Sequence, residues 1–203
     1  MVDVRKVGAW SRVGKLLASA PHRMREAVDK ALLQEAQFFR TKIVEGIREQ
    51  APGGKAFAPL ARTTLAIRRF RGFKGTKALL VQGDLRNSIV VVREGGGVFV
   101  GVLRNAKAKS GQPLVNVAAV HEYGSRPIAV RLTPKARAFL HAAFRKAGLD
   151  SPAGGKPSIG IAIIKVPARP FMGPVFEKFG GEDVASQRFL ERLAKNLGAG
   201  FGK

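Results

Sequence analysis

Side chains able to do acid–base or metal chemistry are few in this sequence and scattered along it. The three histidines are His22, His121 and His141, and no two of them stand at the HxH or HxxxH spacing that brings two imidazoles to one metal ion. His121 is followed by Glu122 and Tyr123, a set of side chains that could transfer protons. Neighbouring residues on a helix point in different directions, so we expect His121 and Tyr123 to pack or to form hydrogen bonds near a turn.

The acidic residues form no paired catalytic set. Glu45 and Glu49 stand one helical turn apart, which an exposed helix face explains, and Glu182 and Asp183 suit the first turn of a helix, where the dipole favours negative charge. The absence of cysteine excludes disulfides, thiolate metal sites and cysteine nucleophiles. No glycine-rich phosphate motif stands at its required spacing. The sequence therefore predicts no enzyme, no cofactor and no metal site.

The charge balance is the strongest chemical signal. The 203 residues include 36 lysines and arginines against 14 aspartates and glutamates, a formal net charge of +22. Such a charge indicates an anionic partner, which is nucleic acid, an acidic protein surface or an anionic membrane. No apolar run of about 18 residues could cross a membrane, and the first residues lack the apolar core of a secretory signal. We therefore expect synthesis in the cytoplasm and no membrane partner.

Two basic clusters are candidates for contact with DNA or with an acidic partner. One lies within residues 62–77 and the other in a loop that begins at residue 104, and their members are Arg68, Arg69, Arg71, Lys74, Lys77, Arg104, Lys107 and Lys109. In the first cluster Phe70 and Phe73 alternate with cations, as in a platform that stacks the bases of single-stranded nucleic acid. The favoured alternative is that both rings pack against the protein while the cations are solvated.

A long amphipathic helix is the first element that must position these side chains. It is expected over about residues 19–50, with Ser19 as N-cap, Pro21 in the first turn, and an apolar stripe of Met24, Val28, Leu32, Phe39, Ile43 and Ile47. At 1.5 Å per residue this helix would span about 40–45 Å. That length suggests a scaffold that also contacts a neighbour.

Shorter elements follow along the chain. The patterns predict helices over 59–70, 115–123 and 133–147, a glycine-turn hairpin over 88–103, strands over 128–132 and 159–166, an extended segment over 167–174, and a last helix, in one or two pieces, over 175–197. Together they predict a single α+β domain over 1–197. Its small, mainly antiparallel sheet core spans about 79–166, and the long N-terminal helix and the further helices pack on it. Residues 198–203 are expected to form a flexible tail.

Several segments match a known family in order and spacing. The pieces are residues 59–64, the Gly-x-Leu-Arg-x-Ser-Ile element that ends at Ile89, the hairpin after it, residues 132–140, His121-Glu122-Tyr123-Gly124, and Pro167-Ala168-Arg169-Pro170-Phe171-Met172-Gly173. Together they resemble the tailed-phage virion morphogenesis proteins, the tail-completion or neck proteins of Mu-like and related phages. The resemblance covers about residues 59–176, and the 167–173 segment is its most specific part.

The resemblance implies a structural protein of the virion without enzymatic activity. Such proteins form cyclic homo-oligomers, and we expect a hexamer or a dodecamer, at the head–tail junction or at the head-proximal end of the tail. The ring would complete the tail, join it to the head and let DNA pass. Its partners would be other neck, connector and tail proteins, together with packaged DNA in the channel. The alternative is a free-standing basic protein that binds nucleic acid.

The matched segments also supply candidate interface residues, which are Arg86, His121, Tyr123, Arg169 and Phe171. Arg169 stands between two prolines and could bind a carboxylate or backbone carbonyls of a neighbour, or else a partner in its own chain. Phe171 is expected in the core rather than at an interface. Gly124 is expected to supply a turn with positive φ after Tyr123.

Overall fold

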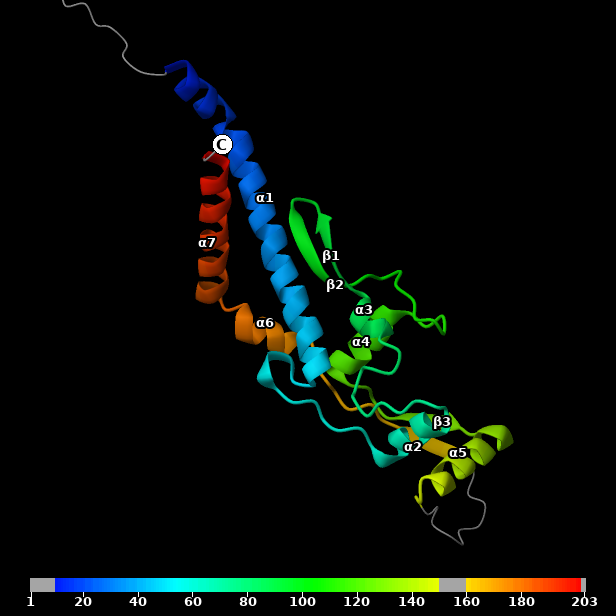
Figure 1. The fold of residues 1–203 in the computed structure, drawn as a ribbon. Coiled ribbons are helices and arrows are strands. Elements are labelled where there is room, and N and C mark those ends of the chain that lie inside the picture. The colour runs from blue at the N-terminus through cyan, green and yellow to red at the C-terminus, as the bar shows by residue number, and fades with distance from the viewer. Residues whose placement is uncertain (1–9, 150–159, 202–203) are drawn as a thin grey trace, which may run out of the picture.

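The computed structural model describes residues 10–149 and 160–201 and has the predicted α+β class. Helices and strands follow in the order α1 (Trp10–Glu49), the 3₁₀ turn η1 (Pro52–Gly54), α2 (Arg62–Phe70), α3 (Asp84–Asn87), β1 (Ile89–Glu94), β2 (Gly97–Val102), α4 (Leu114–Tyr123), β3 (Ile128–Arg131), α5 (Pro134–Lys146), β4 (Ile161–Ile164), α6 (Gly173–Phe179) and α7 (Glu182–Phe201). Figure 1 shows α1 and α7 as a long arm that extends away from the remaining elements. Residues 1–9, 150–159 and 202–203 lie outside the described residues, and so do the parts of the sequence predictions that fall on them.

Helix α1 begins earlier than predicted. It starts at Trp10 rather than at Ser19, and Pro21 lies inside the helix instead of in its first turn. An interior proline removes one backbone hydrogen bond and costs about 3 kcal/mol, so the prediction placed the helix start there. Leu16, Leu17 and Ala18 are strong helix formers, and they carry the helix through that position. With 40 residues, α1 is about 60 Å long.

The core lies on the C-terminal half of α1. Phe39, Ile43 and Ile47 recur every four residues, as predicted, and all three are buried. They pack with Leu85, Ile89, Val102, Leu114, Ala118, Phe171 and Val175. Strands β1 and β2 form the predicted antiparallel hairpin against α1, and their turn contains Gly95 and Gly96, both with positive φ.

The middle of α1 packs against α7, which runs alongside it (Figure 1). Glu35 lies 2.8 Å from Arg192 and also accepts hydrogen bonds from Arg188, and all three side chains are largely buried. The last helix is split into α6 and α7, in agreement with one of the two predicted forms. Helix α7 reaches Phe201 rather than Leu197, so the predicted tail is helical over most of its length.

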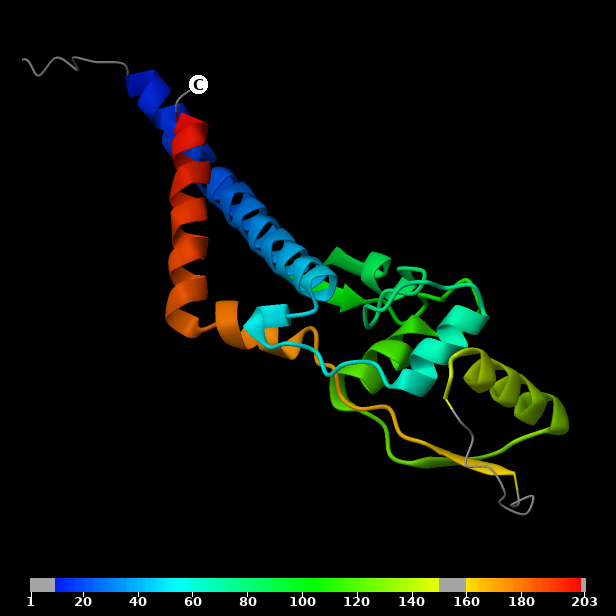
Figure 2. The ribbon, with the colours of Figure 1, turned by 60° about the horizontal axis from the view of Figure 1, so that its bottom comes forward.

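The predicted single sheet core over 79–166 is wrong in one respect, because the strands form two separate two-stranded sheets. Strands β3 and β4 pair antiparallel with each other, with Ile128 opposite Ile164. Figure 2 shows this pair near α2 and α5, away from the β1–β2 hairpin. Extended segments after α4 and before α6 carry the pair out of the core, so it cannot join the first sheet. We call β3 and β4 together the ribbon.

Candidate assembly site

Two segments of the recognised motifs lie against each other. The backbone N–H of Arg169 donates to the carbonyl of His121 at 2.6 Å, and that of Ser125 donates to Val166 at 2.9 Å. The Ser125 hydroxyl in turn accepts from the Val166 N–H at 2.9 Å. We call residues 121–125 and 166–173 together the joint.

Gly124 makes this close approach feasible. Its φ is +80°, which confirms the predicted positive-φ turn. A Cβ atom at this position would stand 3.1 Å from the backbone nitrogen of Ala168. Both the turn and the contact therefore favour glycine.

The Glu122 carboxylate closes the joint. It accepts from the backbone N–H groups of Phe171 at 2.9 Å, Met172 at 3.1 Å and Gly173 at 2.7 Å. These groups stand at the start of α6, where backbone N–H groups have no partner within the helix. The role was missed in the sequence because Glu122 and Gly173 are about 50 residues apart along the chain.

Arg169 and Phe171 lie inside their own subunit. Arg169 is 5% exposed, and its guanidinium donates to the carbonyls of Ala58 at 2.8 Å and Pro59 at 2.9 Å. Phe171 has no exposed surface. Both side chains make their observed contacts within their own chain. The structure thus supports the intrachain partner for Arg169 and the core position for Phe171.

A cavity of about 360 Å³ adjoins the joint. Three arginines from separate segments meet at its lining, namely Arg68 of α2, Arg71 just after α2, and Arg169. No carboxylate of the described residues lies within 4 Å of these three guanidinium groups. Burial, followed by the charge of Arg169, lowers the pKa of Arg68, and burial lowers the pKa of Arg169. The cavity therefore holds positive charge that the described residues do not neutralise.

His121 also lines this cavity. Its Nδ1 atom is buried and has no hydrogen-bond partner among the described residues. Burial lowers the pKa of His121, and the charges of Arg169 and Arg68 lower it further. The histidine is therefore held neutral beside the arginines. Tyr123, by contrast, is 83% exposed and turns away from the interior.

The two basic clusters have different structural settings. Arg68 and Lys77 are tied to the chain, since Arg68 donates to the Lys77 carbonyl at 2.8 Å and Lys77 donates to the Arg48 carbonyl at 2.7 Å. Arg71 lies over the Phe139 ring, with 5.3 Å from its guanidinium carbon to the ring centroid. The exposed cations of the two clusters are Arg69, Arg71, Lys74, Lys77, Arg104, Lys107 and Lys109.

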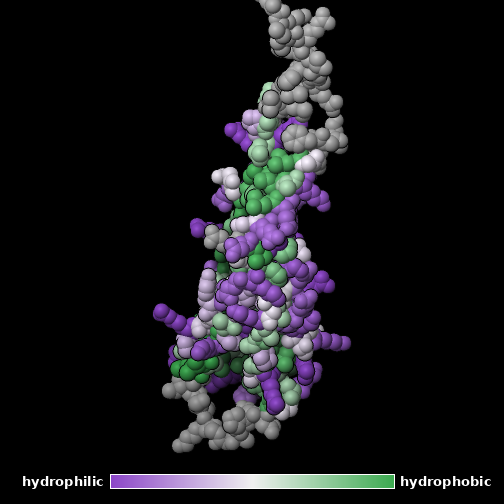
Figure 3. Space-filling view, turned by 90° about the vertical axis from the view of Figure 1, so that its left-hand side faces the viewer, coloured by the Kyte–Doolittle hydropathy of each residue, from purple (hydrophilic) through white to green (hydrophobic). Residues whose placement is uncertain are grey.

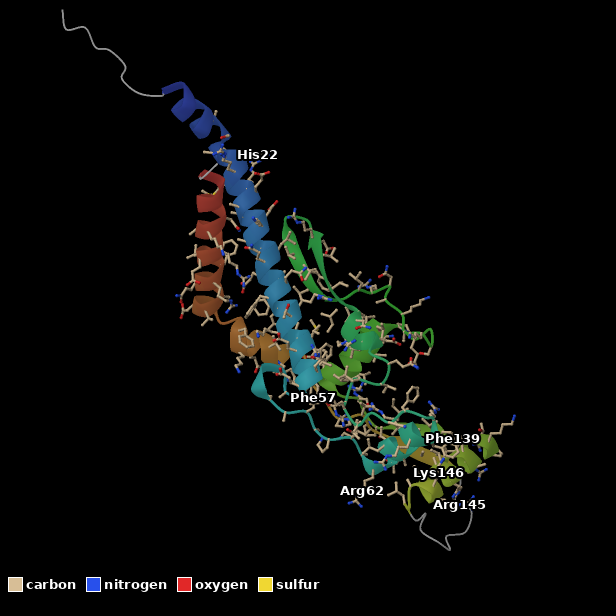
Figure 4. All side chains as sticks on the ribbon, in the orientation of Figure 1. His22, Phe57, Arg62, Phe139, Arg145 and Lys146 are labelled. Atoms are coloured by element: carbon tan, nitrogen blue, oxygen red, sulfur yellow. The ribbon has the colours of Figure 1, made fainter. Side chains whose placement is uncertain are left out.

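The remaining predicted side chains pack locally. Arg86 donates to the side-chain oxygen of its neighbour Asn87 at 2.9 and 3.0 Å. Phe70 packs edge-on against Phe139 at 5.2 Å, and Phe73 lines the cavity. The position of Phe70 supports the packing alternative for that ring. Figure 4 shows Arg62, Arg145 and Lys146 close to Phe139 at this end of the molecule, with His22 far away on the arm.

The ribbon exposes more apolar surface than its sequence predicts. Its exposed aliphatic side chains are Ile128, Val130, Ile161, Ile163 and Ile164, and Ile163 is 76% exposed. Residues 159–166 form the most strongly apolar strand pattern of the chain, which is typical of a core position. The structure instead places the described part of that strand at the surface. Figure 3 shows that apolar surface also lies on the arm, where Val184 and Leu190 of α7 are exposed.

No group of three His, Cys, Asp or Glu side chains within residues 10–149 and 160–201 could hold a metal ion. The same residues include no helix with the length and apolar character that a membrane span needs. The geometry can support packing between subunits and binding of anionic groups.

Comparison with known proteins gives a single finding. The phage virion morphogenesis family matches the chain over residues 10–197, which covers all but the two ends. No curated protein and no solved structure matches the chain. The matched range includes the arm, the joint, the cavity and the ribbon.

Proposed function

The chain belongs to the phage virion morphogenesis family, and from that premise we propose that it is a structural subunit of a ring at the neck or at the head-proximal end of the tail. This ring completes the tail, joins it to the head and lets DNA pass through its channel. The subunit acts through its surfaces and not by catalysis. Its place in the particle is the head–tail junction.

The ribbon is the observation that carries this proposal. Within residues 10–149 and 160–201 its two strands pair with each other and with no other strand, so both outer edges leave backbone groups without a strand partner there. Five aliphatic side chains are exposed on the ribbon. Ile128, Val130 and Ile164 share one face of the ribbon, and Ile161 and Ile163 share the other. Apolar side chains exposed in this way mark a protein–protein contact. We propose that the ribbon packs against a second copy of the chain.

A head-to-tail contact closes into a ring when the rotation between neighbours divides a full turn. The ribbon lies at the end of the molecule far from the arm, so one subunit presents two different surfaces to its neighbours (Figure 2). The proposed stoichiometry is a hexamer or a dodecamer. The exposed apolar residues of α7 supply a candidate second surface.

The charge of +22 per subunit opposes this assembly through self-repulsion. Acidic surfaces of neck, connector or tail proteins, or packaged DNA in the channel, would offset it. The exposed cations Arg69, Lys74, Arg104, Lys107 and Lys109 are the groups best placed to meet such partners.

A free-standing nucleic-acid-binding protein is the second candidate. The net charge and the exposed cations favour it. The packing of Phe70 on Phe139 argues against a base-stacking platform.

Light scattering separates the two candidates. The mass is measured in about 50 mM and about 200 mM salt, with and without duplex DNA, because DNA affinity through several phosphates falls by orders of magnitude over that range. The ring proposal predicts a discrete multi-subunit mass that persists at the higher salt. A monomer that binds DNA only at the lower salt would support the second candidate.

A further inference from the structure

The cavity beside the joint has features that assembly through the ribbon does not use. It combines three guanidinium groups with apolar walls and holds about 360 Å³. We propose that this cavity binds an acidic peptide segment, a carboxylate side chain flanked by apolar residues, from another virion protein. The chemistry of the peptide follows from the lining of the cavity. Only its origin in another virion protein rests on the proposed function.

The charge in the cavity requires an anion. Arg68, Arg71 and Arg169 converge there, and no carboxylate within the described parts of the chain pairs with any of them. Asp84 is the one acidic residue of the lining, and its carboxylate accepts from the backbone N–H of Lys109 at 3.2 Å. A bound carboxylate would relieve the mutual repulsion of the arginines in a partly desolvated site, where charge interactions are stronger than in water.

Hydrogen-bond donors remain available for that carboxylate. Arg169 uses Nε and one terminal nitrogen on the carbonyls of Ala58 and Pro59, which leaves its other terminal nitrogen. Arg68 uses only one terminal nitrogen on backbone carbonyls. Arg71 contacts the Phe139 ring and keeps its N–H groups. Guanidinium groups with two free donors suit the two oxygens of a carboxylate.

The rest of the lining favours a peptide over a nucleic acid. Leu60, Phe73, Leu79 and Leu114 supply apolar walls on which the neighbours of an acidic residue can pack. A DNA backbone presents a continuous row of phosphates and gains little from such walls. A cavity of this volume takes one or two side chains but not a duplex.

The test measures binding of a fluorescently labelled probe, acetyl-Leu-Glu-Phe-Glu-Leu-amide, by anisotropy in about 150 mM salt. A second probe carries Gln in place of both Glu residues. Arg71→Gln removes a cation of the cavity whose guanidinium forms no hydrogen bond that holds the chain. Arg69→Gln is the matched control, because Arg69 is exposed, close in sequence and absent from the lining of the cavity.

We expect the acidic probe to bind the wild type more tightly than the Gln probe. Arg71→Gln should weaken the acidic probe about fivefold, the upper end for an exposed ion pair, and Arg69→Gln should change it less than twofold, because Arg69 does not line the cavity. Equal binding of both probes, or equal losses in the two variants, would overturn the proposal. Displacement of the probe by short duplex DNA would also overturn the proposal and would indicate a nucleic-acid site instead.

The same titration on Ile163→Asp keeps this proposal separate from the ring. Ile163 belongs to the ribbon and does not line the cavity. Probe binding that survives in this variant would support the cavity even if the ring proposal failed. Probe binding that is lost in this variant would contradict a site built within one subunit.

Discussion

The joint and the ribbon are neighbours along the chain, but the joint buries side chains within the subunit and the ribbon exposes them. In the joint, Phe171 is fully buried, and the Glu122 carboxylate and the Arg169 guanidinium are satisfied by backbone groups of the same chain. In the ribbon, which the joint directly precedes and follows, aliphatic side chains such as Ile163 face solvent. One region is closed within the subunit, and the other is open.

This difference separates the residues that identify the family from those that we expect to meet a neighbour. The most specific segment, residues 167–173, holds α6 and the segment before α2 in place. Its likeness to the family therefore reflects how the subunit is built. The proposed contact between subunits lies on a segment whose pattern resembles that of an ordinary buried strand.

The largest effect on stability should come from the closed region. Phe171→Ala is expected to lower the free energy of unfolding by about 4 kcal/mol, because it leaves a cavity in the core. Chemical denaturation followed by circular dichroism measures the loss. Ile163→Ala is the control, and it should cost less than about 0.5 kcal/mol because the side chain is exposed. Equal losses would erase the distinction between the two regions.

Glu122 tests the polar half of the joint. Glu122→Ala should cost about 3 kcal/mol, because three backbone N–H groups lose a charged acceptor. Tyr123→Ala is a matched control next to it, since Tyr123 is 83% exposed. Thermal melts of the two variants give the comparison. A Glu122→Ala protein as stable as Tyr123→Ala would show that the joint is held by other contacts.

His121 sharpens the comparison through pH. Its pKa is lowered in the folded state, so the unfolded chain takes up the proton at a higher pH than the folded chain does. Above the ordinary histidine pKa of about 6.5 both states are neutral and full stability is present. As pH falls from there through the folded-state pKa, the unfolded chain takes up the proton first and the free energy of unfolding falls. Arg68, Arg71, Arg169 and Asp84 are the other charged groups of that cavity.

The measurement is the melting temperature of wild type and His121→Gln between about pH 7.5 and about pH 5, the range in which histidine titrates. Wild type should lose more stability than the variant as pH falls, by up to about 1.4 kcal/mol for each pKa unit of lowering. If the melting temperature fell equally with pH in wild type and His121→Gln, burial and the arginine charges would not lower the pKa of His121 as stated.

The smallest effect on stability is expected in the open region. Ile163→Thr keeps a β-branched side chain on β4 and should change the free energy of unfolding by less than about 0.5 kcal/mol. Its melting temperature, taken at a concentration low enough to keep the protein monomeric, gives the value. A large loss there would mean that the ribbon supports its own subunit.

Local features of the fold were readable from the sequence. The spacing of Phe39, Ile43 and Ile47 predicts the buried stripe of α1, and Thr133 caps α5 by accepting from the Ala136 N–H at 3.2 Å. Gly95 and Gly96 form the hairpin turn. Each of these depends on residues close together in the chain.

Features that depend on distant residues were not readable. The carboxylate of Glu122 acts on N–H groups about 50 residues away, and the cavity joins Arg68 to Arg169 across a longer interval. The apolar pattern of β4 is typical of a covered strand, but it does not show whether the same subunit or a neighbouring subunit covers it. A local rule on proline predicts a helix start at Ser19, with Pro21 in the first turn, whereas the helix begins at Trp10.

The mass of the protein in solution tests most directly whether the ribbon joins subunits. Light scattering on wild type, Ile163→Asp and the control Arg69→Gln compares an added charge on the ribbon with a charge change at an exposed site outside the ribbon. We predict one discrete multi-subunit mass for wild type and Arg69→Gln, and a folded monomer for Ile163→Asp. The same mass for all three proteins would contradict the account.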